Sequence, residues 1–138
     1  MRLGKNAKVD LLKRAPLFAL CSKKELAEIA TVADELDLPA GRALIREGER
    51  GREFFVLLEG EADVTQDGKQ ISTMKDGDFF GEIALVSDAP RTATVTARTP
   101  VRVLVVTDRA FHTVLERVPS IQLKVLKALA ERLAPTTI

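Results

Sequence analysis

The chain has 138 residues, 46% of them hydrophobic and 30% charged, a balance typical of one folded domain with a buried core. Its 21 basic and 20 acidic residues leave a net charge of +1, which excludes a strong general attraction to nucleic acid or membranes. A single cysteine, Cys21, excludes an internal disulfide and a cysteine-based zinc cluster. No apolar run approaches the roughly 20 residues of a membrane helix, so we expect a soluble, cytoplasmic protein.

Residues 1–31 have the sequence features of helices. Pro16 should interrupt the first helical segment, because proline lacks the amide that continues a helix. Ser22 is a predicted helix N-cap, and Glu25 follows at the spacing of a capping box. The N-terminal part of the chain is therefore expected to be a small helical segment.

Residues 32–107 have a different pattern, in which short apolar runs alternate with turns that contain glycine. Turns at this spacing predict many short antiparallel strands, and hence a β-roll. The pair Asp67-Gly68 is the clearest hairpin signal, because Asp-Gly suits a type I′ turn. The charge run REGERGRE, residues 46–53, is interpreted as a solvated turn.

Residues 108–138 are again predicted to be helical, with Asp108 as a cap and Pro119 as an interruption. The last helix has one predicted apolar stripe, formed by Ile121, Val125, Leu126, Leu129 and Leu133. Only five residues follow Leu133, too few for a helix-turn-helix, so we expect no DNA binding by this chain. The order of helices, β-roll and helices predicts the α+β class, with all of 1–138 as one domain.

Most candidate catalytic groups are isolated. His112, the only histidine, is expected to be a surface or boundary residue, since a metal site on a β-roll needs several ligands. Cys21 is expected to be a small, half-buried residue near a helix start. No glycine-rich phosphate loop of the dinucleotide or P-loop type occurs. We therefore expect no enzyme activity, no metal and no cofactor.

One stretch remains, FGEIALVSDAPRTATV, residues 80–95, which places an acid and a base among apolar neighbours. GEIALV predicts a short helical turn, whose N-terminal amides and leading Gly81 would favour a bound anion. Arg91 can fork onto a phosphate through two parallel hydrogen bonds. Glu82 would then need a donor of its own, such as a sugar hydroxyl. Together these features describe a site for a sugar phosphate with a flat base.

This stretch resembles the phosphate-binding cassette of the cyclic nucleotide-binding domain family. The family pattern runs roughly F-G-E-[LI]-A-L and, after a few residues, [PR]-R-[STA]-A-T-V; here it reads FGEIAL and then PRTATV. The resemblance extends over essentially the whole chain. It implies an antiparallel roll of the jelly-roll type over 32–107 with the cassette at 80–95, flanked by helices at 1–31 and 108–138.

The resemblance also implies roles for individual residues. Glu82 would accept the ribose 2′-hydroxyl, with Gly81 beside it, and Arg91 would pair with the cyclic phosphate. The amides of Ile83 and Ala84, together with Thr92 and Ala93, would complete the cradle. The base-facing strand positions correspond to Val64, Ile71 and Ser72. Leu126 and Leu129 of the last helix are candidates for a lid over the base, and that helix is the expected moving part of a ligand-driven population shift.

Two questions stay open at this stage. A threonine directly after the cassette arginine, the position of Thr92 here, often accompanies a preference for cyclic GMP in this family. Bacterial relatives with Ser or Thr at that position bind cyclic AMP, and we favour cyclic AMP as the ligand of this chain. The chain could also retain the fold only as an interaction or dimerisation domain, although an unused pair of buried charges would be costly. A small cupin-like enzyme is a further alternative, which the single histidine disfavours. We expect a sensor module that either forms a homodimer or acts on an attached or partner effector domain.

Overall fold

The computed structural model describes residues 2–133, and side chains as far as residue 131. It divides the chain into two compact units. One is formed by the two ends of the chain, up to Ala33 and from Arg109 onward, and is helical. The other is the continuous segment Asp34–Asp108, which contains all the strands.

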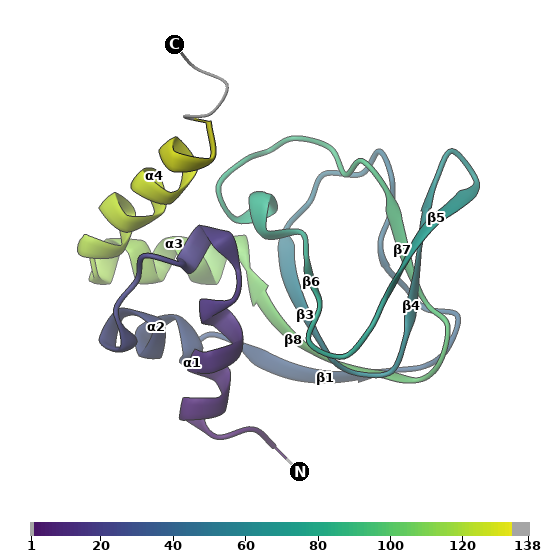
Figure 1. Cartoon of the computed structure of the whole chain (residues 1–138), viewed down its shortest axis with the longest axis horizontal. Helices are drawn as coiled ribbons and strands as arrows, with labels where there is room; N and C mark the ends of the chain where they lie inside the picture. Colours follow the sequence, from purple (N-terminus) through teal and green to yellow (C-terminus); the bar gives the residue numbers. More distant parts are fainter. Residues whose placement is uncertain (1, 134–138) are drawn as a thin grey trace. The chain divides into compact units, whose positions relative to one another are not determined.

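The helical unit brings together elements from both ends of the sequence (Figure 1). Its elements are α1 (Lys5–Lys13), the short 3₁₀ helix η1 (Pro16–Phe18), α2 (Lys23–Ala30), α3 (Asp108–Arg117) and α4 (Ser120–Leu133). The predicted break at Pro16 is confirmed, because this residue starts η1 after α1 has ended. Phe18 and Phe111 pack together in the core of this unit, with ring centroids 5.6 Å apart. The unit therefore has its own hydrophobic core.

The capping box at the start of α2 is confirmed and forms part of a larger network. Ser22 and Glu25 exchange two hydrogen bonds, of 2.8 and 3.1 Å. The buried Glu25 carboxylate also accepts hydrogen bonds from the Ser120 hydroxyl at 2.6 Å and from Lys124 Nζ at 2.9 Å. These bonds lower the pKa of Glu25 to about 2, with the Ser120 bond as the largest cause. Glu25 thus connects α2 to α4 across 95 residues of sequence.

The buried face of α4 differs from the predicted stripe. Ile121, Val125 and Ala128 are buried and follow the i, i+4, i+7 spacing of one helix face. Leu126, which we placed in the stripe, is 63% exposed, and Leu129 is only partly buried. The Leu133 side chain lies outside the described residues. The prediction followed the large apolar residues, whereas the helix packs the small Ala128 inward.

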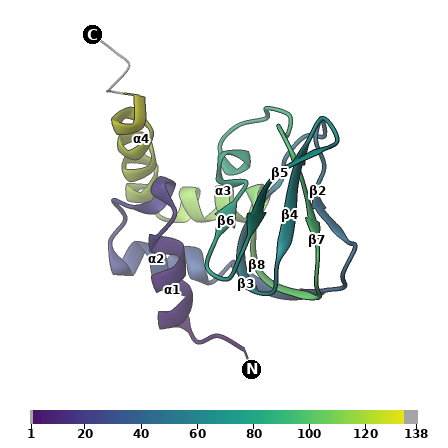
Figure 2. The same cartoon turned by 45° about the vertical axis from the view of Figure 1, so that its right-hand side comes forward.

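The β unit is a roll of two antiparallel sheets (Figures 1 and 2). The first sheet has the order β1-β8-β3-β6 and the second β2-β7-β4-β5. The strands are β1 (Asp34–Leu38), β2 (Ala43–Ile45), β3 (Glu53–Glu59), β4 (Ala62–Gln66), β5 (Lys69–Met74), β6 (Phe79–Phe80), β7 (Thr94–Ala97) and β8 (Val101–Thr107). Side chains of both sheets meet in one core, including Leu57 and Val103 from the first and Val64 and Val95 from the second.

The predicted hairpin at Asp67-Gly68 connects β4 to β5. Asp67 has a φ of 53° and Gly68 a φ of 78°, as a type I′ turn requires of its two central residues. The strands pair from Gln66↔Lys69 to Ala62↔Met74, with a shift in register between Val64 and Thr65. Local turn chemistry therefore sets this part of the roll.

Aromatic pairs fix the strand that leads into the cassette. The short strand β6 pairs with β3 through Phe55↔Phe80 and Val56↔Phe79. The rings of Phe55 and Phe80 stack with centroids 5.1 Å apart, and Phe54 meets Phe79 edge-on at 6.2 Å. Because Gly81 follows directly, this packing determines where the cassette leaves the sheet.

The predicted α+β class is confirmed. In the sequence, helices come before and after the antiparallel roll, and the roll contains one short helix. That short helix is η2 (Glu82–Leu85). Among residues 2–133, no helix is long and apolar enough to cross a membrane.

Candidate ligand-binding site

The cassette leaves β6 through a glycine that no other residue could replace without strain. Gly81 has φ 82° and ψ 14°, in the left-handed region, and serves as the N-cap of η2. A Cβ at this position would lie 2.6 Å from Nη1 of Arg91 and 2.8 Å from the Glu53 carbonyl oxygen. Gly81 therefore provides both the turn and the space for the arginine.

Arg91 is the main charged group of the site, and its side chain is only 8% exposed. Its Nη2 donates to the Glu53 carbonyl at 2.6 Å, and its Nη1 donates to the Gly81 carbonyl at 3.4 Å. The Glu53 carboxylate lies 3.8 Å from Nη2. Burial lowers the pKa of Arg91, and Glu53 opposes that change. Since an arginine side chain has five N–H donors, these contacts leave donors for a ligand.

A second glycine, Gly51, packs against the same guanidinium. A Cβ on Gly51 would lie 2.7 Å from both Cζ and Nε of Arg91 and 2.9 Å from the Ala84 Cβ. Gly51 has no left-handed φ, so close approach alone explains its residue type. The arginine thus packs closely against two glycines, Gly51 before β3 and Gly81 before η2.

Gly51 belongs to the charge run 46–53, which is not the simple solvated turn that we expected. Its backbone pairs with the cassette: the Gly48 amide donates to the Arg91 carbonyl, and the Arg91 amide donates to the Glu49 carbonyl, both at 2.8 Å. Arg50 forms a β-bridge with Pro90 and an ion pair with Asp88. The segment 46–53 therefore fixes the backbone of Arg91. Sequence patterns gave no indication of this pairing, because its partners lie about 40 residues apart.

The cassette closes one side of a pocket of about 460 Å³. Seven predicted residues line it, namely Gly81, Glu82, Ile83, Ala84, Arg91, Thr92 and Ala93, and Val64 lines it from β4. Apolar side chains that we had not predicted complete the wall, among them Ile45, Met74, Phe79 and Val95. A volume of this size and a mainly apolar wall with a few polar groups are typical of small-molecule sites.

The other two base-facing candidates, Ile71 and Ser72, are not among the residues that line this pocket. Ser72 pairs with Val64 across β4 and β5, and Ile71, its neighbour, projects from the opposite face of the sheet and is 56% exposed. Met74, two residues beyond Ser72, lies on the pocket side. Ile71 has no Cα partner, because the register shifts between Val64 and Thr65, and of Ser72 and Met74, which share one side of the strand, only Met74 lines the pocket.

The backbone amides of η2 are less available than we expected. The Ala84 amide already donates to the Gly81 carbonyl at 3.1 Å, so it closes the first turn of the helix. By its position, the Ile83 amide has no acceptor within the helix. Because η2 has only four residues, its dipole is small, and Arg91 supplies most of the positive charge of the site.

Glu82 and Thr92 lie at the same pocket with different exposure. Glu82 is buried, with 7% of its surface exposed, and is the first residue of η2. Thr92 follows Arg91 and is exposed, while its carbonyl accepts a hydrogen bond from Gln66 at 3.0 Å. The structure therefore brings one buried carboxylate, one buried guanidinium and one accessible hydroxyl to a single cavity.

The residues considered for catalysis are not arranged for it. Cys21 is buried, and burial is the main cause that raises its pKa to about 11, so the thiol stays protonated at neutral pH. His112 is exposed on α3. Within residues 2–133, no group of three or more His, Cys, Asp and Glu side chains is placed to hold a metal ion.

Comparison with known proteins agrees with this geometry. Residues 35–118 match the model of the cyclic nucleotide-binding domain, which is more than half of the chain. The chain therefore belongs to the cyclic nucleotide-binding domain family.

Relatives of known description include cAMP-dependent protein kinase regulatory subunits. The chain is 40% identical to that of Aspergillus niger over 94 residues, covering 67% of this chain and 23% of the relative. It is 35% identical to that of Neurospora crassa over 128 residues, covering 91% of this chain and 33% of the relative. The chain thus spans about a quarter to a third of the length of these relatives.

Two solved structures have the same fold. The N-terminal domain of a transcriptional regulator from Streptomyces coelicolor matches with a TM-score of 0.82 and 32% identity, over 93% of this chain and 95% of that one. The structure of cAMP-bound PfPKA-R matches with a TM-score of 0.66 and 29% identity, over 92% of this chain and 46% of that one.

Proposed function

We propose that this chain binds cyclic AMP, in preference to cyclic GMP, as a non-catalytic sensor module. The observation on which the proposal depends is the buried guanidinium of Arg91, which lines a pocket and retains unused donors. A buried charge with spare donors beside a cavity is expected to have a counter-charge from outside the chain. The cyclic phosphate is that counter-charge.

The other residues of the pocket receive roles that follow from their chemistry. Glu82 accepts a hydrogen bond from the ribose 2′-hydroxyl, a donor that suits a carboxylate. Val64, Met74 and Val95 provide apolar contact for the purine. Thr92 and Ala93 line the phosphate end beside Arg91. The regulatory output would pass to an attached or separate effector, since the chain spans only part of its relatives.

The preference for cyclic AMP is supported by the relatives named for that nucleotide and by the neighbour that contains it. Thr92 offers a hydroxyl that could reach a guanine amino group, so cyclic GMP is the direct competitor. The test is calorimetry of the purified chain with each nucleotide under identical conditions. We expect binding of both and a lower Kd for cyclic AMP, whereas a tenfold preference for cyclic GMP would overturn this choice.

The remaining alternative is a domain that retains the fold for interaction or dimerisation and binds no nucleotide. A thermal-shift scan separates the two cases, because a ligand that binds only the folded state raises Tm with concentration. We expect an increase in Tm with cyclic AMP and none with adenosine, which lacks the phosphate. No shift with either cyclic nucleotide at millimolar concentration would favour the alternative.

A further inference from the structure

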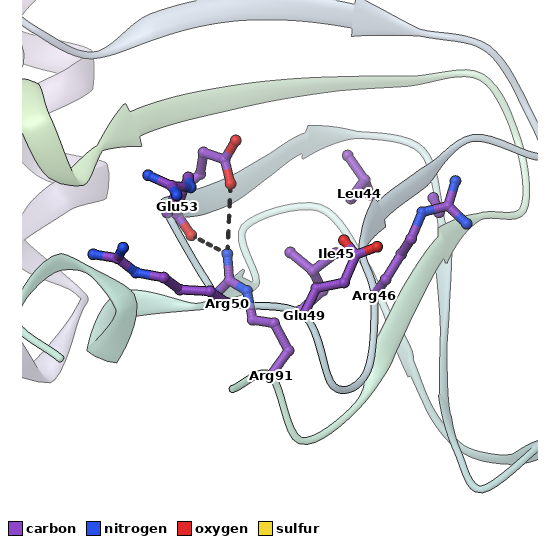
Figure 3. Close-up of a pocket in the computed structure, with 9 residues that line it drawn as sticks. Leu44, Ile45, Arg46, Glu49, Arg50, Glu53 and Arg91 are labelled. Atoms are coloured by element: carbon purple, nitrogen blue, oxygen red, sulfur yellow. Dashed lines mark hydrogen bonds and ion pairs between the residues drawn. The ribbon is translucent and has the colours of Figure 1, made fainter. Parts of the chain in front are cut away.

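A second cavity, of about 310 Å³, lies against the same arginine. Arg91 lines both this smaller cavity and the 460 Å³ pocket, whereas Glu53 lines only the smaller one. Figure 3 shows Glu53 joined to the Arg91 guanidinium through both its backbone carbonyl and its carboxylate. The guanidinium therefore borders the pocket to which we assign the phosphate and has a carboxylate 3.8 Å away.

We infer that Glu53 is a specificity-determining residue that makes the site favour a singly charged phosphodiester over a doubly charged phosphomonoester. The inference rests on the proposed function, because it assigns the phosphate of the ligand to Arg91. It concerns the class of ligand that is rejected: open-chain nucleotides such as AMP, which share the base and the ribose with cyclic AMP.

The argument is one of charge. A phosphomonoester has a charge of about −1.5 to −2 at neutral pH, whereas a phosphodiester has −1. Arg91 supplies one positive charge, and the Glu53 carboxylate lies 3.8 Å from it. Glu82 places a second, buried carboxylate on the pocket wall. The Glu53 carboxylate beside the arginine therefore repels the additional negative charge of a monoester.

Three more arginines line the smaller cavity, and because they are the same in the wild type and in a Glu53 variant, the comparison of the two measures the charge of Glu53. Arg46, Arg50 and Arg52 are exposed, so water and salt screen their charges. Arg50 also pairs with Asp88. The Glu49 carboxylate lies on the side of the cavity away from the Arg91 guanidinium in Figure 3. Glu53 is thus the carboxylate of this cavity with a direct effect on Arg91.

The test compares two open-chain ligands, AMP and its O-methyl ester, which is a phosphodiester with a lower negative charge and one additional methyl group. The contribution of the methyl group cancels when the ratio of the two affinities is compared between proteins. The affinities of both ligands are measured by displacement of a fluorescent cyclic AMP analogue from the wild-type chain and from Glu53→Gln. The Kd ratio of AMP to the methyl ester should fall by about threefold in the variant, as expected for one partly solvated unit charge. Raising the salt concentration should reduce the difference between the two proteins.

Glu49→Gln is the matched control, because it removes a carboxylate of the same cavity that forms no ion pair with Arg91. Its Kd ratio should stay within about 1.5-fold of the wild-type ratio, as expected for a screened charge. Glu53→Asp retains the charge but withdraws it by one methylene, so its ratio should fall between those of wild type and Glu53→Gln. The side chain of Glu53 is 41% exposed, so these variants should fold.

The outcomes separate this inference from the proposed function. If the wild-type chain binds cyclic AMP and Glu53→Gln leaves the ratio unchanged, the inference is wrong and the proposed function stands. An equal change of the Kd ratio in Glu49→Gln would also overturn the inference, because any carboxylate of the cavity would then have the same electrostatic effect as Glu53. If the wild-type chain displaces no cyclic nucleotide analogue, both are wrong.

Discussion

Two buried charged side chains, Glu25 in the helical unit and Arg91 in the roll, differ in how their hydrogen-bonding capacity is used. Glu25 accepts hydrogen bonds from Ser22, Ser120 and Lys124, so its charge is neutralised within the chain. Arg91 donates to the carbonyls of Glu53 and Gly81, and it also lines an open pocket. The first charge is satisfied within the chain, whereas the second is the one to which we assign the phosphate of a ligand.

The difference also appears in the residues that surround each charge. Glu25 has Lys124 and hydroxyl or amide donors around it, which lower its pKa to about 2 and keep it ionised. Arg91 is flanked by two glycine backbones, Gly51 and Gly81, which approach closely but supply no counter-charge. The hydrogen bonds of Arg91 go to backbone carbonyls, and the one carboxylate near it, that of Glu53, is 3.8 Å away and partly exposed. A buried charge with so little compensation beside a pocket indicates a binding site better than burial by itself does.

The largest expected effect is that of Arg91→Ala. Removing the guanidinium leaves the phosphate without a partner, so affinity for cyclic AMP should fall by about 3–5 kcal/mol, or roughly 10²–10³-fold. The free energy of unfolding should change by less than about 1 kcal/mol, because Glu53 is partly exposed and is not left as a buried charge. Calorimetry and urea unfolding of the same sample measure both quantities.

Arg98→Ala is the control for this variant, since Arg98 is exposed and pairs with Asp63 on the surface. Its affinity should equal that of wild type. Binding of cyclic AMP by Arg91→Ala within threefold of wild type would contradict the role of this residue and remove the distinction between the two charges.

The next effect concerns Glu82, the buried carboxylate on the pocket wall. Glu82→Ala should weaken cyclic AMP binding by roughly 1–3 kcal/mol, the range for a hydrogen bond to a charged group. Deletion of the ligand hydroxyl tests the contact directly: 2′-deoxy-cyclic AMP should bind the wild type more weakly than cyclic AMP. In the variant, the two ligands should bind almost equally well.

This double cycle separates a direct contact from a general loss of shape. If 2′-deoxy-cyclic AMP and cyclic AMP still differ in the variant as they do in the wild type, Glu82 does not contact that hydroxyl. Glu82 would then have a structural role like that of Glu25, and not a ligand-binding role like the one proposed for Arg91.

The smallest effect on binding is expected for Glu25→Gln, which tests the structural side of the comparison. At pH 7 the variant should lose roughly 1–3 kcal/mol of unfolding free energy, because charge-assisted hydrogen bonds disappear. The folded pKa of Glu25, about 2, lies below its ordinary value, so its contribution is present above about pH 4.5. That contribution is lost as the pH falls toward 2.

Urea unfolding of wild type and variant at several pH values measures this difference. The gap between the two proteins should narrow between about pH 4.5 and 2 and should be constant above that range. Affinity for cyclic AMP should remain within twofold of wild type. A large loss of affinity with unchanged stability would reverse the roles assigned to the two charges.

Local sequence features predicted much of the molecule. The hairpin at Asp67-Gly68 and the capping box of Ser22 and Glu25 depend on residues three or fewer positions apart, so the sequence predicts them directly. The cassette motif likewise places Gly81, Glu82 and Arg91 within eleven consecutive residues, and all three line the pocket. Backbone preferences and short-range hydrogen bonds act before the chain has folded.

The tertiary structure alone decided what surrounds Arg91 and which side chains point inward. Gly51 and Glu53 meet Arg91 across about 40 residues, and no local pattern marks such a contact. Strand pairing placed Met74 at the pocket and turned Ile71 away, because one step along a strand reverses the face. Long-range packing set these positions, since burial depends on neighbours that only the complete fold brings together.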